Sequence, residues 1–173
     1  MLAKLTAALA ATCLLSGAAL AQSAKPTDAQ IAHIAYTAGE IDIDVAKQAL
    51  AKSKNKEVRS FAEDMVRDHT AVNKQALDLV KKLKVKPEDN DTSRALSKAA
   101  ADKKAELAKL NGADFDKAYV SNEAAYHKTV NGALETTLIP FANNAELKSL
   151  LQTGLKVFQG HQQHAEHVAA QLR

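Results

Sequence analysis

Residues 56–84 read KEVRSFAEDMVRDHTAVNKQALDLVKKLK, and this stretch decides the fold class. Its apolar residues recur at spacings of three, four and seven, the period of an amphipathic α-helix. The stripe comprises Val58, Phe61, Ala62, Met65, Val72 and Val80. His69 lies eleven residues after Val58 and therefore at the centre of the stripe, because eleven residues complete about three helical turns. The stretch predicts a long helix that buries a histidine.

Similar patterns on both sides predict further helices over 28–53, 92–110, 114–138 and 145–171. Thr27 to Gln30 and Asn143 to Glu146 have the spacing of capping boxes at two of the helix starts. The prolines, Pro26, Pro87 and Pro140, fall where the patterns break.

Composition and chain order together indicate the architecture. Only 4% of residues are aromatic, and the chain has no Trp, 6 Gly and 3 Pro, which is atypical of a turn-rich β-sandwich or barrel. The short helix at 92–110 is long enough, roughly 28 Å, to cross the height of a bundle. We therefore predict an all-α, ferritin-like four-helix bundle with a short extra helix in the crossover between the second and third main helices.

The first 21 residues have the pattern of a signal peptide. Lys4 precedes the uncharged apolar stretch LTAALAATCLLSGAAL, and Ala19-Leu20-Ala21 gives the small-x-small cleavage pattern. We predict a signal peptide at 1–21, a single helical domain at 22–173 and export to the periplasm or cell envelope. An uncleaved membrane anchor is the alternative. Cleavage would remove Cys13, the single cysteine, so the mature chain would have no disulfide and no thiolate metal site. It would also remove the apolar stretch, so we expect no transmembrane segment in the mature chain.

Charge and motifs exclude several functions. The formal net charge of +3 is small and the charges are interleaved, so we expect no nucleic-acid partner. The sequence contains no glycine-rich phosphate loop and no recognisable nucleophile constellation, so no enzymatic reaction is assigned. The lysine-rich run 74–86 is compatible with an envelope surface or protein partner, although a solvated helix end is the better explanation, because Asp78 interrupts the run and the core needs its apolar residues. The oligomeric state is left open.

Five polar residues fall on or beside the apolar stripes, each near the middle of its helix. Asp42 follows Ile31 by eleven residues, Glu123 and His127 lie on the flank of their stripe beside Asn122, and the others are His69 and His161. Counting from the turns brings Asp42 level with His69 and Glu123 level with His161. We therefore expect all five side chains to meet inside the bundle.

Buried carboxylates and imidazoles need partners, because an unpaired buried polar group costs several kcal/mol. His and carboxylate ligands suit one divalent ion of iron, zinc or manganese, with or without redox activity. The alternatives are a metal-free hydrogen-bond network that fixes helix register, and a pH-sensitive bundle. His164 and His167 are expected on the solvated face of the last helix.

Three segments together resemble one exported bacterial family. They are NKEVRSFAEDMVRDHT at 55–70, GADFDKAYVSNEAAYHK at 112–128, and His161 followed by Ala165. The family is domain of unknown function (DUF) 4142, whose members are often labelled outer-membrane proteins. The resemblance implies a ferritin-like fold and export, with no established activity. It places an acidic residue at Asp42 and the characteristic histidines at His69, His127 and His161.

Di-iron ferritin-like proteins carry Glu-x-x-His on two helices. This chain departs from that pattern: Glu63, Glu123 and Glu166 are followed three residues later by Val66, Tyr126 and Ala169. A ferroxidase or oxygenase is therefore weakly supported, and a single-metal or metal-free site is favoured.

Overall fold

The computed structural model describes residues 25–172, so the predicted signal peptide at 1–21 and Cys13 lie outside the described residues. All regular structure in this range is helical. In chain order it comprises α1 (Asp28–Lys52), α2 (Lys56–Lys82), α3 (Asp91–Ala108), α4 (Gly112–Ala133), the π-helix η1 (Leu134–Leu138), α5 (Ile139–Phe141) and α6 (Ala145–Gln171). The predicted all-α class is confirmed.

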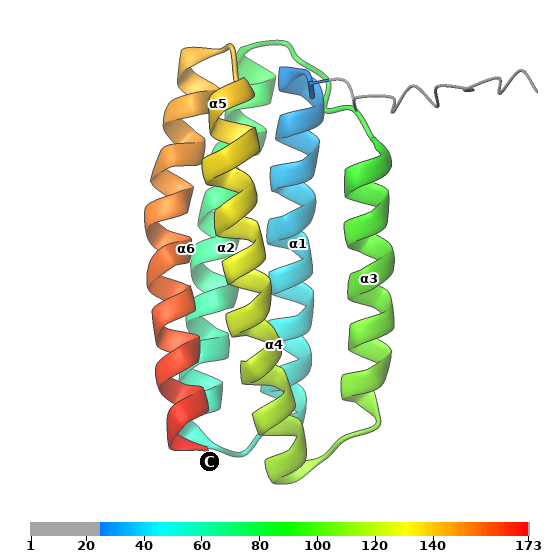
Figure 1. Ribbon diagram of the computed structural model, residues 1–173, viewed down its shortest axis with the longest axis vertical. Coiled ribbons are helices and arrows are strands. Elements are labelled where there is room, and N and C mark those ends of the chain that lie inside the picture. Colours follow the sequence, from blue (N-terminus) through cyan, green and yellow to red (C-terminus); the bar gives the residue numbers. More distant parts are fainter. Residues whose placement is uncertain (1–24, 173) are drawn as a thin grey trace, which may run out of the picture.

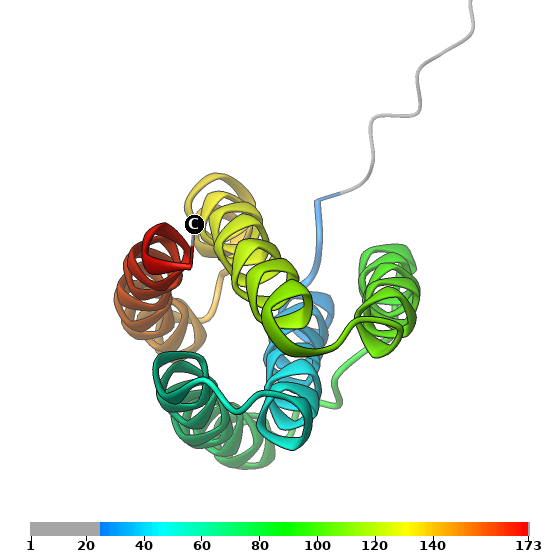
Figure 2. The same ribbon diagram turned by 90° about the horizontal axis from the view of Figure 1, so that it is seen from below.

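Four long helices form the bundle, and α3 is the crossover helix. In Figure 1, α1 and α2 form one antiparallel pair, and α4 and α6 form the other. Since α3 runs the length of the bundle outside these four, α2 and α4 point in the same direction. Figure 2 shows α1, α2, α6 and α4 arranged in a ring, with α3 outside it beside α1 and α4. This is the predicted ferritin-like connection.

Polar side chains define the helix starts and tie two of them together. The predicted capping box is present at α1, where the backbone N–H of Gln30 donates to Thr27 Oγ1 at 3.3 Å. The prediction for α6 was wrong by one residue, because Asn144, not Asn143, accepts from the first-turn N–H groups. The backbone N–H groups of Asn143 and Asn144 donate to the Asp28 carboxylate at 2.8 and 2.9 Å, which fastens the start of α6 to that of α1.

Pro140 does not end the fourth predicted helix where its pattern breaks. The chain widens into η1, whose last turn is closed by the bond from the backbone N–H of Ile139 to Leu134 O, and helix continues to Phe141. A proline ring clashes with the carbonyl of the fourth residue before it in a regular α-helix. The wider π turn gives that ring space, which is why the proline is tolerated inside the helix.

The apolar core is divided into two clusters. One is centred on Val58, Phe61, Met65, Phe115 and Tyr119, near the α1–α2 turn. The other is centred on Ile31, Ile34, Leu134, Leu138 and Leu151, at the opposite end of the bundle. Between them lies a buried polar layer. Within residues 25–172, no helix is both long enough and apolar enough to span a membrane.

Candidate metal centre

All five predicted site residues lie in the buried polar layer, and every main helix contributes to it. Asp42 comes from α1, His69 from α2, Glu123 and His127 from α4, and His161 from α6. Their exposed fractions are between 1% and 6%. Each occupies an apolar stripe of its helix, so burial of the stripe carries the polar group inward with it.

The wheel assignment for α4 was inexact. Glu123 and His127 were expected on the flank of the inward face and Asn122 near its middle. The structure buries Glu123 and His127 completely and leaves Asn122 half-exposed. The inward face therefore runs through Tyr119, Glu123 and His127, which follow each other at spacings of four residues.

The five side chains form two overlapping groups of three. In the first, His69, His127 and His161 each offer a nitrogen within 4.8 Å of the other two, and their ring centroids are 5.2–5.6 Å apart. In the second, Asp42, Glu123 and His127 offer ligand atoms within the same limit. His127 belongs to both groups. His69 Nε2 also lies 3.5 Å from Asp42 Oδ2, so the predicted alignment of α1 and α2 is confirmed.

Hydrogen bonds orient two of the imidazoles. Nδ1 of His127 lies 3.0 Å from the carbonyl oxygen of Glu123. Since a carbonyl only accepts, Nδ1 carries the proton and Nε2 has a free lone pair. Nε2 of His161 lies 3.1 Å from Asp68 Oδ2, so by the same argument Nδ1 of His161 is the free nitrogen. Histidine metal ligands are typically held in this way, by a carbonyl or carboxylate on the second nitrogen.

The free nitrogens are buried without a protein partner. Within the described part of the chain, His127 Nε2, His161 Nδ1 and both nitrogens of His69 accept or donate no hydrogen bond. One oxygen each of Asp42 and Glu123 is in the same condition. Most buried polar atoms in proteins have a partner, so such a concentration at one point requires an explanation.

Burial keeps the three imidazoles neutral. It lowers the pKa of His69 well below the usual range, with the nearby His127 and His161 adding to the effect. Burial also lowers the pKa of His127 to about 4. It lowers the pKa of His161 as well, while the bond to Asp68 acts in the opposite direction. Neutral imidazole is the form that binds a metal ion.

Asp42 and Glu123, which we call the acidic pair, retain protons near neutral pH. Burial raises the pKa of Asp42 well above its usual range, and the adjacent Glu123 raises it further. Burial raises the pKa of Glu123 to about 7, although the hydrogen bond with Asp42 opposes this rise. Two carboxyl groups in contact cannot both ionise easily, so the pair shares protons. A divalent cation could replace them.

The residues fit a transition-metal ion. Three imidazole nitrogens and two carboxylates are ligands that suit iron, zinc and manganese. A metal–ligand distance of about 2.0–2.2 Å requires ligand atoms roughly 3–3.5 Å apart. The ligand atoms of each group lie within 4.8 Å of one another, which is compatible with this requirement. The donor types, the tautomers and the unpartnered atoms together agree with a metal centre.

Sequence reasoning missed two residues next to the centre. Asp68 comes directly before His69 on α2, and its carboxylate accepts a hydrogen bond from His161 on α6. The same carboxylate also accepts from Arg67 Nε at 2.7 Å. The phenyl ring of Phe158 stacks on His69 with centroids 4.6 Å apart. The sequence did contain a signal for Phe158, because it lies three residues before His161 on the same apolar stripe.

His164 was expected on the solvated face and is half-buried instead. Its ring packs edge-on against Phe61, with centroids 5.2 Å apart, and its Nδ1 lies 3.7 Å from Asp64 Oδ2. His167 is exposed, as predicted.

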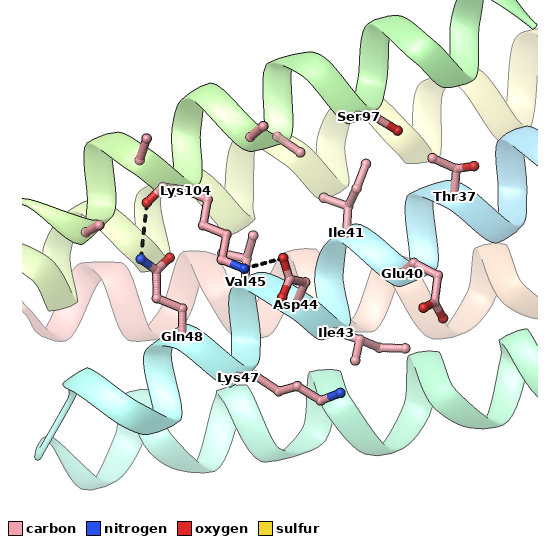
Figure 3. A pocket seen from close by; sticks show the side chains of 14 residues that line it. Thr37, Glu40, Ile41, Ile43, Asp44, Val45, Lys47, Gln48, Ser97 and Lys104 are labelled. Atoms are coloured by element: carbon pink, nitrogen blue, oxygen red, sulfur yellow. Dashed lines mark hydrogen bonds and ion pairs between the residues drawn. The ribbon is translucent and has the colours of Figure 1, made fainter.

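A pocket of about 760 Å³ lies away from the centre, between α1 and α3 (Figure 3). Here Gln48 Nε2 donates to Lys104 O at 3.1 Å, and Lys104 forms an ion pair with Asp44. The five predicted site residues all belong to the described part of the chain, and none of them lines this pocket. It is an open groove beneath the crossover helix, and its charged groups are exposed.

Comparison with known proteins agrees with the helical architecture. A crystal structure described as "putative secreted protein DUF305 from Streptomyces coelicolor" matches with a TM-score of 0.71 and 11% sequence identity, covering 84% of this chain and 93% of that one. At this identity the likeness shows the fold alone. No curated protein matches the sequence. The family model described as "Domain of unknown function (DUF4142)" matches residues 14–168, and the chain therefore belongs to the DUF4142 family.

Proposed function

We propose that this protein is an exported metal-binding protein that holds one divalent ion of iron, zinc or manganese between its four main helices. The ligands are drawn from Asp42, His69, Glu123, His127 and His161. The observation that carries the proposal is the convergence of buried lone pairs, on neutral imidazoles and on the acidic pair, that have no partner within residues 25–172.

The charges of the site support this assignment. With both carboxyl groups ionised, three neutral imidazoles and two carboxylates carry two negative charges, which a divalent ion neutralises. Without a cation, that burial is costly, and the raised pKa values of the acidic pair are the result. A bound ion would supply Lewis acidity and, for iron or manganese, redox chemistry. The chain's own residues position the ligands and exclude water.

Export and domain organisation belong to the same proposal. The apolar stretch ending in Ala19-Leu20-Ala21 supports a signal peptide at 1–21 and a mature helical domain at 22–173. The structural relative is described as secreted, which agrees with a periplasmic or envelope location. The partner would be an envelope surface or another protein there.

Elemental analysis of the protein tests the proposal. The protein is purified without a histidine tag or chelator, beside His69→Gln and the matched control His167→Gln, whose histidine is exposed on α6. We expect about one equivalent of metal in the parent and the control, and loss in His69→Gln. Far-UV circular dichroism establishes that each variant is folded.

The metal-free alternative gives a different result. If the parent contains no metal, takes up none of the three ions at micromolar concentration, and His69→Gln only lowers the melting temperature, the polar layer serves helix register. The metal proposal is then wrong.

A further inference from the structure

An apolar cavity of about 390 Å³ lies between the helices, on the side of the polar layer away from the α1–α2 turn. Side chains from α1, α2, α3, α4, η1 and α6 line it. Its walls include buried core residues of the second apolar cluster, such as Ile34, Leu138 and Leu151. Among the described residues that line this cavity, none carries an ionisable side chain.

Small side chains create the cavity. Ala32, Ala35, Ala38 and Ala76 are buried or half-buried lining residues, and larger side chains at these positions would fill the space. Protein interiors are normally packed as densely as organic crystals, with few voids larger than a water molecule. A cavity of 390 Å³ falls within the range of small-molecule sites, roughly 300–1,000 Å³.

The cavity opens towards the surface beside the crossover helix. Thr92 on α3 and Thr129 on α4 line it and are exposed, while Thr137 in η1 is half-exposed. These hydroxyl groups put polar atoms at the rim. The buried amide of Asn73 also belongs to the lining, but its Nδ2 already donates to Glu40 Oε1 at 2.8 Å, and the other buried residues of the described lining are apolar. The π-helix forms part of the same wall, and π-helical turns are frequent at functional sites.

Phe158 separates the cavity from the candidate metal centre. Its ring lines the cavity and stacks on His69, and its centroid lies 6.0 Å from that of His161 and 6.4 Å from that of His127. Gly154 makes room for this ring, because a Cβ at Gly154 would lie 3.3 Å from Phe158 Cε2.

We propose that this cavity binds an uncharged, largely apolar small molecule whose inner end contacts Phe158, beside the histidines. An engineered apolar cavity of about 150 Å³ accommodates benzene, so 390 Å³ corresponds to roughly 15 non-hydrogen atoms. The absence of charged groups from the described lining excludes an ionic inner end, since a buried charge there would have no partner. The proposal extends beyond metal binding and does not depend on it.

A pair of fluorescent probes tests both the site and its chemistry. N-phenyl-1-naphthylamine is uncharged and has about the predicted size, and 8-anilinonaphthalene-1-sulfonate adds a sulfonate to the same framework. We expect saturable one-site binding of the uncharged probe by the full protein, and at least tenfold weaker binding of the sulfonate. Equal binding of the two probes, or no saturable binding of the uncharged one, overturns the proposal.

Cavity-filling variants locate the binding site. Ala38→Leu on α1 and Ala76→Leu on α2 fill the cavity from two helices, because Ala38 is buried and Ala76 is half-buried in the lining. Ala125→Leu is the matched control because Ala125 is exposed on α4 and does not line the cavity. We expect both filling variants to lose tenfold or more in probe affinity and the control to keep it. Melting temperatures identify any unfolded variant. If one filling variant does not fold, the probe affinity of the other one decides whether the probe binds in the cavity. Parent-like affinity in a folded filling variant refutes the assignment.

Zinc titration of the same samples separates the two proposals. Probe binding that persists in protein unable to bind zinc leaves the cavity site standing and removes only the metal. Zinc binding without probe binding supports the metal centre and refutes the cavity site.

Discussion

Replacing Asp68 by asparagine is expected to weaken zinc binding while leaving the fold intact. The Asp68 carboxylate accepts from His161 Nε2 at 3.1 Å, which leaves Nδ1 to face the other ligands. The asparagine amide has the same shape but lacks the negative charge. In the parent, that charge fixes this tautomer and makes the imidazole more basic. Loss of such a partner typically lowers metal affinity 10–100-fold, or about 1.4–2.7 kcal/mol.

The stability of the metal-free protein should change far less. The Asp68 side chain is 28% exposed and its ion-pair partner Arg67 is 66% exposed, so solvent screens the pair. We expect a change below about 1 kcal/mol in the free energy of unfolding. Asp64→Asn is the matched control, because Asp64 lies one turn earlier on α2, is 29% exposed and also pairs with Arg67, but faces His164.

The assay is a competition titration of zinc against a chromophoric chelator at pH 7.5, with urea unfolding of each metal-free protein. The expected result is weaker zinc binding in Asp68→Asn and parent-like binding in Asp64→Asn. Equal affinities in the two variants would refute the reasoning, because the hydrogen bond to His161 would then contribute nothing to a metal site.

Three other experiments, the last on a pair of glycine variants, test the site and the packing around it. Zinc affinity should fall at least about tenfold per pH unit below pH 7, because the raised pKa values of the acidic pair mean that the ion must displace at least one proton there. A titration series from pH 8 to pH 6 measures this, and a flat profile contradicts it. Phe61→Ala should cost about 3–5 kcal/mol of unfolding free energy, since the ring is fully buried; urea denaturation checks it, and a cost below about 1 kcal/mol would be contrary to the packing. Gly39→Ala should destabilise by about 1–3 kcal/mol, because the new Cβ would lie 2.3 Å from Asn73 Oδ1 and displace that buried amide from its hydrogen bonds. Gly132→Ala, with nothing within 4 Å, should instead stabilise by up to about 1 kcal/mol, so thermal melting of the two glycine variants in opposite directions is the expected result and equal shifts would contradict it.

The helical architecture was predictable because the information is local. Apolar spacing within 56–84 and its counterparts defines which residues must be buried, and helix geometry converts that spacing into a face. The length of the segment between the second and third main helices then implied a crossover. The limits of local reasoning appear at Pro140, where the chain widened into a π turn and continued as a helix. Packing of the surrounding helices decides that outcome.

The candidate site divides in the same way. Counting along two helices from a shared turn aligned Asp42 with His69, since each turn fixes the relative height of its neighbours. The five polar residues that the sequence pattern predicted to be buried are all buried in the polar layer. Counting along α4 placed Glu123 and His127 on a flank, because a wheel with few apolar residues leaves its rotation uncertain by about one residue.

What the sequence by itself determined is the helical fold class and the presence of buried imidazoles and carboxylates, because both follow from one-dimensional periodicity. The tertiary structure alone decided that Asp68 orients His161, that Phe158 stacks on His69, and that small residues from several helices enclose a cavity beside them. These features join residues that are distant in the chain. Their distances and orientations depend on how the helices rotate and cross, which no spacing within a single helix encodes.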